Sequence, residues 1–223
     1  MANIDFLKTK DINRHNIAFL QYGNTMHFVV TNLNDPIVSY DNRTNFVDKM
    51  IINPYSDRTC PCGRRGCVES ELTPSATMSK LREVFSAEKT PFLYEAARGS
   101  FENVNQDMIT MAYEKDDKAV KEILNGELTL LAVLLNNLYF STNPQKIVLH
   151  QFKFQNEKAF QKLKDAVTEI GGALVSSKIE LSIIEDKHRF LSGCALAIRE
   201  LFFNRGGFDT SSNNCLLYTS PSP

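Results

Sequence analysis

Three cysteines within eight positions constrain this chain more than any other feature. They are Cys60, Cys62 and Cys67, in the segment Cys-Pro-Cys-Gly-Arg-Arg-Gly-Cys. Zinc prefers thiolate and imidazole ligands in a tetrahedral arrangement, and closed structural sites have four of them. The proline and first glycine suit a tight turn, and Gly66 lets the chain fold back so that the third sulfur reaches the same ion. We therefore predict a zinc-binding knuckle over residues 60–67, with a structural rather than catalytic zinc.

The alternative is that the three cysteines are free thiols that happen to be neighbours. The chain has five cysteines in all, an odd number, and three of them cluster. In a reducing compartment such clustering favours metal binding over disulfides. Arg64 and Arg65 are expected at the exposed tip, where their charge partly offsets that of the thiolates. A fourth ligand has to come from outside the segment.

The composition is that of an ordinary globular protein. Hydrophobic residues make up 43% of the 223 positions, and the net charge is -1 from 25 basic and 26 acidic residues. This balance excludes a disordered chain and gives no bulk positive field for nucleic acid. The longest uninterrupted apolar run, residues 128–135, is too short to span a membrane, and the N-terminus lacks the pattern of a signal peptide. We expect a cytoplasmic protein with no membrane partner.

Hydrophobic periodicity predicts helices in the middle of the chain and alternating strands and helices in its last third. This order indicates an α/β fold. The Ser-, Asn- and Pro-rich segment 208–223 resembles translated adapter sequence, so we expect it to be disordered and place one domain over residues 1–207. The predicted helices are 11–22, the segment from Thr73, 92–98, 104–113, 116–139, 157–170 and 191–203, and the predicted strands are 26–31, 37–40, 146–149 and 179–184.

The knuckle also carries a resemblance to a known family. Continued to Glu69 it reads Cys-x-Cys-Gly-x-x-Gly-Cys-x-Glu, which resembles the ROK family (repressor, open reading frame, kinase) of sugar kinases and sugar-responsive repressors. The resemblance covers roughly residues 5–203 and is strongest to regulators of the N-acetylglucosamine and xylose type. It implies an actin-like (ribonuclease H-like) ATPase-type fold, here mainly the second lobe with a zinc knuckle and a helical insert.

The resemblance also implies roles for single residues. Lys-Asp-Ile-Asn at positions 10–13 resembles the family's Asn-Asp-x-Asn segment, so Asp11 matches the catalytic base of the kinases, or a relic sugar contact. Asn13 and Glu69 are then expected to bind the sugar. The other interpretation of Asp11 is a helix N-cap. Further matching segments are Asn-Pro-Tyr at 53–55, Leu-Tyr-Phe-Ser-Thr-Asn-Pro-Gln-Lys-Ile-Val at 138–148 and Leu-Ser-Gly-Cys-Ala-Leu-Ala at 191–197.

The chain departs from the family pattern in four places. The phosphate-binding segment Asp-x-Gly-Gly-Thr does not occur, no glycine lies between Val29 and Val47, and the strand ending at 148–151 has none. A nucleotide therefore lacks its usual glycine cradle, and ATP is not expected as a cofactor. In the family's Gly-Glu-x-Gly-His, Val47 falls at the Glu and Met50 at the zinc-binding His. Because a thioether is a poor zinc ligand, the fourth ligand is Asp48, water or a residue not placed.

Two functions follow from the resemblance. The first is the sugar- or sugar-phosphate-binding effector domain of a transcriptional regulator without kinase activity, which reaches DNA only through a helix-turn-helix upstream of Met1 and associates with a second copy. The second is a hexose or N-acetylhexosamine kinase, truncated in its first lobe. A third interpretation is a decayed gene or partial product, which the lost site residues favour.

Overall fold

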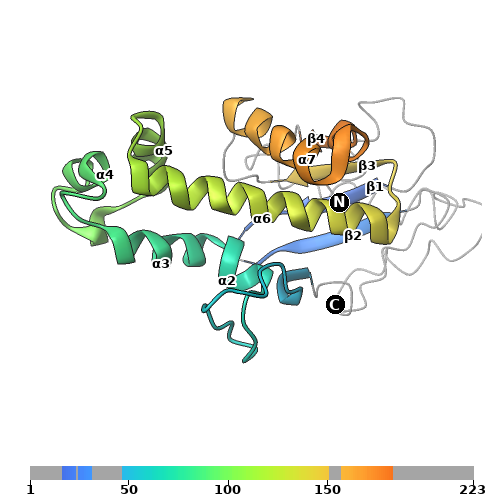
Figure 1. The fold of residues 1–223 in the computed structure, drawn as a ribbon, viewed down its shortest axis with the longest axis horizontal. Coiled ribbons are helices and arrows are strands. Elements are labelled where there is room, and N and C mark those ends of the chain that lie inside the picture. The colour runs from blue at the N-terminus through green and yellow to red at the C-terminus, as the bar shows by residue number, and fades with distance from the viewer. Residues whose placement is uncertain (1–16, 24, 32–46, 151–156, 183–223) are drawn as a thin grey trace, which may run out of the picture. The chain divides into compact units, whose positions relative to one another are not determined.

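The computed structural model describes residues 17–23, 25–31, 47–150 and 157–182, which all lie in one compact unit, Ile12–Ser182. Figure 1 shows their strands and helices. Several predictions fall outside the described residues. They concern Asp11, Asn13, the strand at 37–40, the helix at 191–203 and the tail at 208–223.

A four-stranded sheet, in the order β2-β1-β3-β4, forms one layer of this unit. β1 (Ile17–Gln21) pairs antiparallel with β2 (His27–Thr31) and parallel with β3 (Lys146–His150), which pairs parallel with β4 (Ile179–Leu181). The sequence-based helix over 11–22 is therefore wrong from Ile17 onward. Four consecutive β1 residues, 17–20, are buried, because a central strand is covered on both faces and shows no alternation.

The remaining strand predictions are confirmed where residues are described. β3, α7 (Glu157–Ser177) and β4 alternate as expected of an α/β fold. The predicted helix at 157–170 is shorter than the observed one, which continues past a break at Gly172, where φ is 80°. Gly171 just before the break lies close to Asn136 of α6 (Lys118–Thr142), and a Cβ atom there would meet the Asn136 side chain. The glycine pair thus permits both the break and the close approach of two helices.

The middle of the chain forms the predicted helices, and two of them begin at a residue whose side chain caps the helix. Thr73 caps α3 (Pro74–Val84) by accepting a hydrogen bond from the Ala76 amide, and Pro74 occupies the first turn. Asn105 caps α5 (Gln106–Glu114) in the same way by accepting from the Met108 amide. The other elements here are α2 (Val68–Leu72), α4 (Pro91–Ala96) and η2 (Phe101–Asn103).

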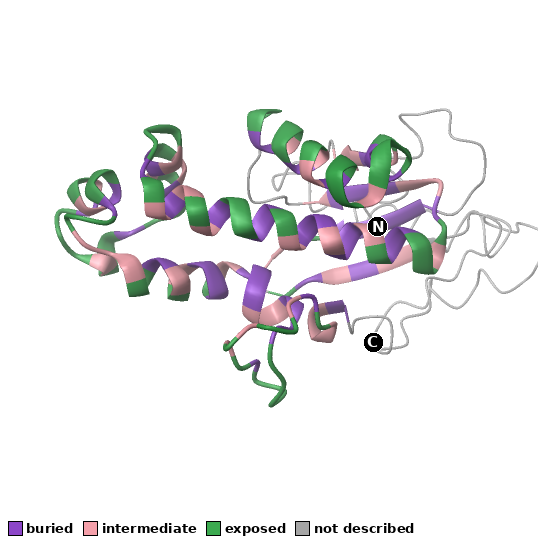
Figure 2. Cartoon of the chain, viewed as in Figure 1, coloured by how far each residue is buried: buried purple, intermediate pink, exposed green. Residues whose placement is uncertain are grey.

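α6 (Lys118–Thr142) is the longest described helix and the centre of the hydrophobic core. Buried residues run along its length, as Figure 2 shows, and it packs beside α7 and α3. Its length and composition would also suit a membrane span, but half of the apolar window is buried inside the protein, as expected of a core helix. The prediction of a buried helix at 116–139 is confirmed.

Candidate metal centre

Residues 51–67 form a loop that returns on itself before α2. Two isolated antiparallel bridges, Ile51 with Cys67 and Thr59 with Arg65, hold its two sides together. Inside the second bridge the Cys60 amide donates to Arg64 at 2.7 Å, and the Gly63 amide donates back to Cys60 at 2.8 Å. These short-range bonds make the tight turn that the proline and glycine spacing predicts.

Gly66 makes the return of the chain possible. Its φ is 67°, and a Cβ atom at this position would overlap the Asn53 carbonyl group. The two backbone segments lie this close because the Gly66 carbonyl accepts hydrogen bonds from the amides of both Ile52 and Asn53, at 2.9 and 3.2 Å. Only glycine satisfies the backbone angle and the close approach together.

The loop gathers three cysteine sulfurs at one point. The sulfurs of Cys60, Cys62 and Cys67 all lie within 4.8 Å of one another, and those of Cys62 and Cys67 are 3.7 Å apart. Tetrahedral ligands at a zinc–sulfur distance of about 2.3 Å place sulfurs about 3.8 Å apart. Cys60 and Cys67 are buried and Cys62 is exposed. The three residues could therefore hold a metal ion, and their spacing fits it.

The three thiols differ in their electrostatic surroundings. Arg64 donates its Nε–H to Cys62 at 3.5 Å, and this bond lowers the pKa of the Cys62 thiol to about 6. Burial raises the pKa of Cys60 to about 12 and also raises the pKa of Cys67. Arg64 is in turn fixed by a bond to the Lys49 carbonyl at 2.9 Å.

A carboxylate and a lysine lie against the sulfurs. Glu69, in the first turn of α2, has its Oε2 atom 3.1 Å from the Cys60 sulfur, and it also accepts a hydrogen bond from the Lys49 ammonium. The Lys49 bond holds the pKa of Glu69 below its usual value, and the same bond raises the pKa of Lys49. Lys49 also pairs with Asp48 at 3.3 Å.

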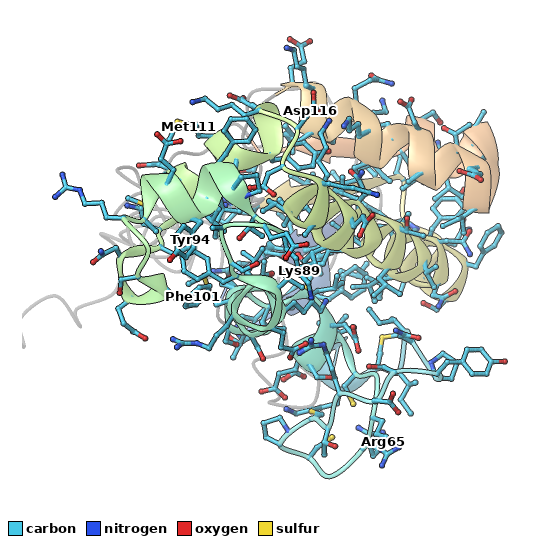
Figure 3. The ribbon with its side chains drawn as sticks, turned by 60° about the vertical axis from the view of Figure 1, so that its left-hand side comes forward. Arg65, Lys89, Tyr94, Phe101, Met111 and Asp116 are labelled. Atoms are coloured by element: carbon cyan, nitrogen blue, oxygen red, sulfur yellow. The ribbon has the colours of Figure 1, made fainter. Side chains whose placement is uncertain are left out.

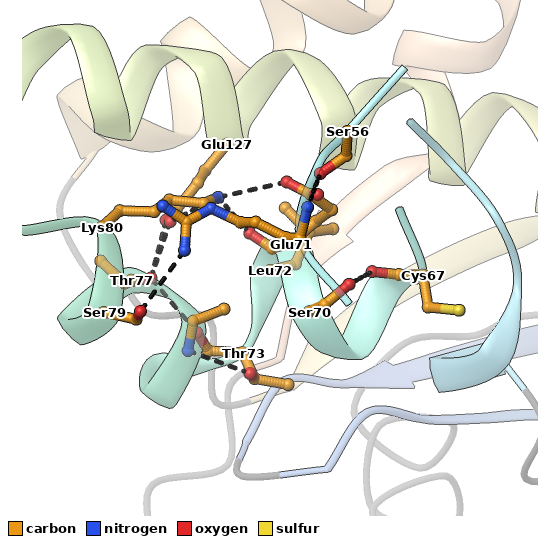
Figure 4. A network of polar contacts seen from close by, with 12 residues as sticks. Ser56, Cys67, Ser70, Glu71, Leu72, Thr73, Thr77, Ser79, Lys80 and Glu127 are labelled. Carbon is orange, nitrogen blue, oxygen red and sulfur yellow. Dashed lines mark hydrogen bonds and ion pairs between the residues drawn. The ribbon is translucent and has the colours of Figure 1, made fainter. Parts of the chain in front are cut away.

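Polar contacts connect the loop to the helices behind it. Arg58 donates both to Ser79 and, in a two-pronged ion pair at 2.8 and 2.9 Å, to Glu83 of α3. Ser70 donates to the Cys67 carbonyl at 3.0 Å, as Figure 4 shows. The tip of the loop is free of such contacts to α3, and Figure 3 shows Arg65 there, on the part of the loop that projects from the helices.

A buried ion network continues from α2 into the core. Lys80 of α3 donates to the Glu71 carbonyl at 2.6 Å and pairs with the Glu127 carboxylate of α6 at 3.3 Å. Thr77 donates to Glu127 at 2.8 Å (Figure 4). Both Glu71 and Glu127 are almost fully buried. Because buried charges need partners, this network fixes how α2, α3 and α6 lie against one another.

The structure thus brings together four of the seven residues singled out in the sequence. These are the three cysteines and Glu69. Asp48, the predicted alternative for the fourth ligand, is not grouped with the sulfurs and pairs with Lys49, and Asp11 and Asn13 lie outside the described residues. Met50, at the position of the family's zinc-binding His, packs against the hydrophobic core. Sequence reasoning missed Lys49. The only signal for it is its charge opposite to that of Glu69, twenty positions away, and no periodicity connects the two.

The fold and the site together define the class of protein. It is an α/β protein in which a cysteine-rich loop, able to hold a metal ion, precedes the helical segment. The model of the ROK family matches residues 48–188, so the chain belongs to the ROK family. Membership implies the actin-like ATPase fold for the described sheet and helices. No curated protein sequence matches the chain significantly.

Solved structures of the same fold include both kinases and a regulator. A ROK family protein from Streptococcus pneumoniae TIGR4, in complex with sucrose, has a TM-score of 0.67 at 12% identity, covering 89% of this chain and 63% of that one. A ROK family glucokinase from Streptomyces griseus, in complex with glucose and AMPPNP, has a TM-score of 0.56 at 12% identity, covering 74% and 53%. A ROK family transcriptional regulator, a homologue of the Escherichia coli MLC protein, has a TM-score of 0.58 at 16% identity, covering 78% and 42%. The chain therefore spans about half the length of these proteins.

Proposed function

We propose that the chain is the sugar-binding effector part of a ROK-type transcriptional regulator, holding one structural zinc ion and lacking kinase activity. It acts in the cytoplasm, associates with a second copy, and reaches DNA through a helix-turn-helix encoded upstream. Family membership and the sugar-bound relatives support a sugar or sugar phosphate as ligand. The gathered cysteines, Cys60, Cys62 and Cys67, support the zinc site.

The end of β3 is the observation that favours the regulator over the kinase. Ligands of open α/β sheets bind beyond the carboxyl ends of the parallel strands. β3 ends there in His150, where the family resemblance expects a glycine, and the His150 ring contacts the Ser182 hydroxyl at 3.1 Å. A side chain at this position leaves less room for a nucleotide than a glycine would. The glycine-free stretch between Val29 and Val47 points the same way.

The kinase is the second candidate, supported by the glucokinase among the solved structures. Calorimetry with a panel of sugars and sugar phosphates, paired with a coupled phosphorylation assay containing ATP and the same sugars, separates the two. The regulator predicts heat from at least one sugar and no turnover. Robust phosphorylation would overturn it, and so would an Asp-x-Gly-Gly-Thr segment without a helix-turn-helix upstream of Met1 in the source gene.

The zinc site has its own test. Metal analysis of the purified chain should find about one zinc per chain, and Cys62→Ser together with Cys67→Ser should remove it. A protein without zinc whose thiols titrate freely would refute this part of the proposal.

A further inference from the structure

The three sulfurs leave one position of a tetrahedral site to another ligand. Structural zinc sites have four protein ligands. Glu69 has an oxygen 3.1 Å from the Cys60 sulfur. It lies outside the group of ligand atoms that are all within 4.8 Å of one another, so its side chain has to turn toward the other two sulfurs when a metal binds. We propose that the Glu69 carboxylate is the fourth zinc ligand and that Lys49 is the residue that positions it. The inference rests on the zinc site proposed above. It gives Glu69 a role different from the sugar contact that the family resemblance implies.

The local structure delivers Glu69 to the cluster. Cys67 is the N-cap of α2 and Glu69 stands in its first turn, so the last sulfur and the carboxylate leave the same helix end. Lys49 then holds the carboxylate through its ammonium, while its backbone carbonyl is fixed by Arg64. A carboxylate oxygen is an accepted zinc ligand at about 2.0–2.2 Å.

The surrounding charges suit four anionic ligands. A zinc ion with three thiolates and one carboxylate carries an excess of two negative charges. The Lys49 ammonium, which also pairs with Asp48, lies on the carboxylate, and the Arg64 guanidinium lies on the Cys62 sulfur, so the two cations offset part of that excess. Met50 does not compete for the position, because its side chain packs against the core and a thioether is a poor zinc ligand.

Two variants at one position test the assignment. Glu69→Gln should lower zinc affinity by at least about 100-fold, the upper end of what loss of a merely supporting group costs. Glu69→His should restore tight binding and add imidazole scattering to the zinc X-ray absorption spectrum. Lys49→Met should weaken binding by about 10-fold without changing the set of ligands. The matched control is Glu102→Gln on η2, which removes an exposed carboxylate paired to Arg82 and should leave zinc affinity unchanged.

The outcomes separate this inference from the proposed zinc site. Affinity is measured by competition with a chelator, and the circular dichroism of each metal-free variant confirms that it folds. Wild-type protein without zinc would refute the metal site itself. Wild-type protein with zinc, combined with Glu69→Gln of equal affinity or Glu69→His without imidazole scattering, would refute the role of Glu69 alone.

Discussion

Replacing Gly66 with alanine should disrupt the loop of residues 51–67, and the structure allows the loss in free energy of unfolding to be worked out. An alanine in the left-handed region costs about 1–2 kcal/mol. Its Cβ would also lie 2.6 Å from the Asn53 carbonyl carbon, so the backbone around Asn53 has to move. The Gly66 carbonyl then loses its bonds from Ile52 and Asn53, each of which contributes about 1 kcal/mol. The sum is about 3–4 kcal/mol.

Gly63 provides a matched control within the same loop. Its φ is 83°, but no atom lies within 4 Å of the position a Cβ would take. Gly63→Ala should therefore cost only the backbone term of about 1–2 kcal/mol. Urea unfolding and the rate at which the three thiols react with a chromogenic disulfide report on both variants. Equal effects of the two substitutions would refute the argument that the close approach at Asn53 sets the loop.

Three further predictions concern the core and the metal. Burial, and secondarily the charge of Glu127, raises the pKa of Tyr22 well above its ordinary value, so the folded state keeps the phenol proton that the unfolded state loses above about pH 10. The stability advantage of wild type over Tyr22→Phe in urea unfolding should therefore shrink as the pH rises past that point. A difference that stays constant with pH would contradict this prediction. Leu135→Ala, fully buried in α6, should cost about 2–5 kcal/mol in urea unfolding, whereas Leu174→Ala on the exposed side of α7 should change stability by less than about 0.5 kcal/mol. Chelation of the metal should speed amide hydrogen exchange in α2 and, through Lys80, around Glu127 of α6, and unchanged exchange in α6 would show that the loop acts as a separate unit.

The helices were predictable because local signals determine them. Thr73-Pro74 and the apolar spacing after it mark α3 without reference to the rest of the chain. β1 could not be read in this way, because its partners β2 and β3 decide its conformation and β3 begins more than a hundred residues later. Its run of buried residues has no period that separates a central strand from a buried helix.

The candidate site divides along the same line. Its cysteines could be predicted because a metal imposes a short spacing that survives in the sequence. The residues that anchor them do not share that spacing. Lys49 meets Glu69 across twenty positions and Arg58 meets Glu83 across twenty-five, and either pair could have been two solvated surface charges. Only the folded structure shows that both pairs hold the cysteine-bearing loop, residues 51–67, in place.

The contacts of the loop explain how a small metal site can matter to a much larger unit. One side of the loop is tied to α3 through Arg58, and the other side becomes α2 directly after Cys67. α2 is then joined through Lys80 to the buried Glu127 of α6. Because a buried ion pair tolerates little displacement before it loses its partners, a change in the position of α2 has to be shared by α3 and α6. A metal ion held by the three cysteines would therefore act on the arrangement of three helices, although their sulfurs come from only eight consecutive residues, 60–67.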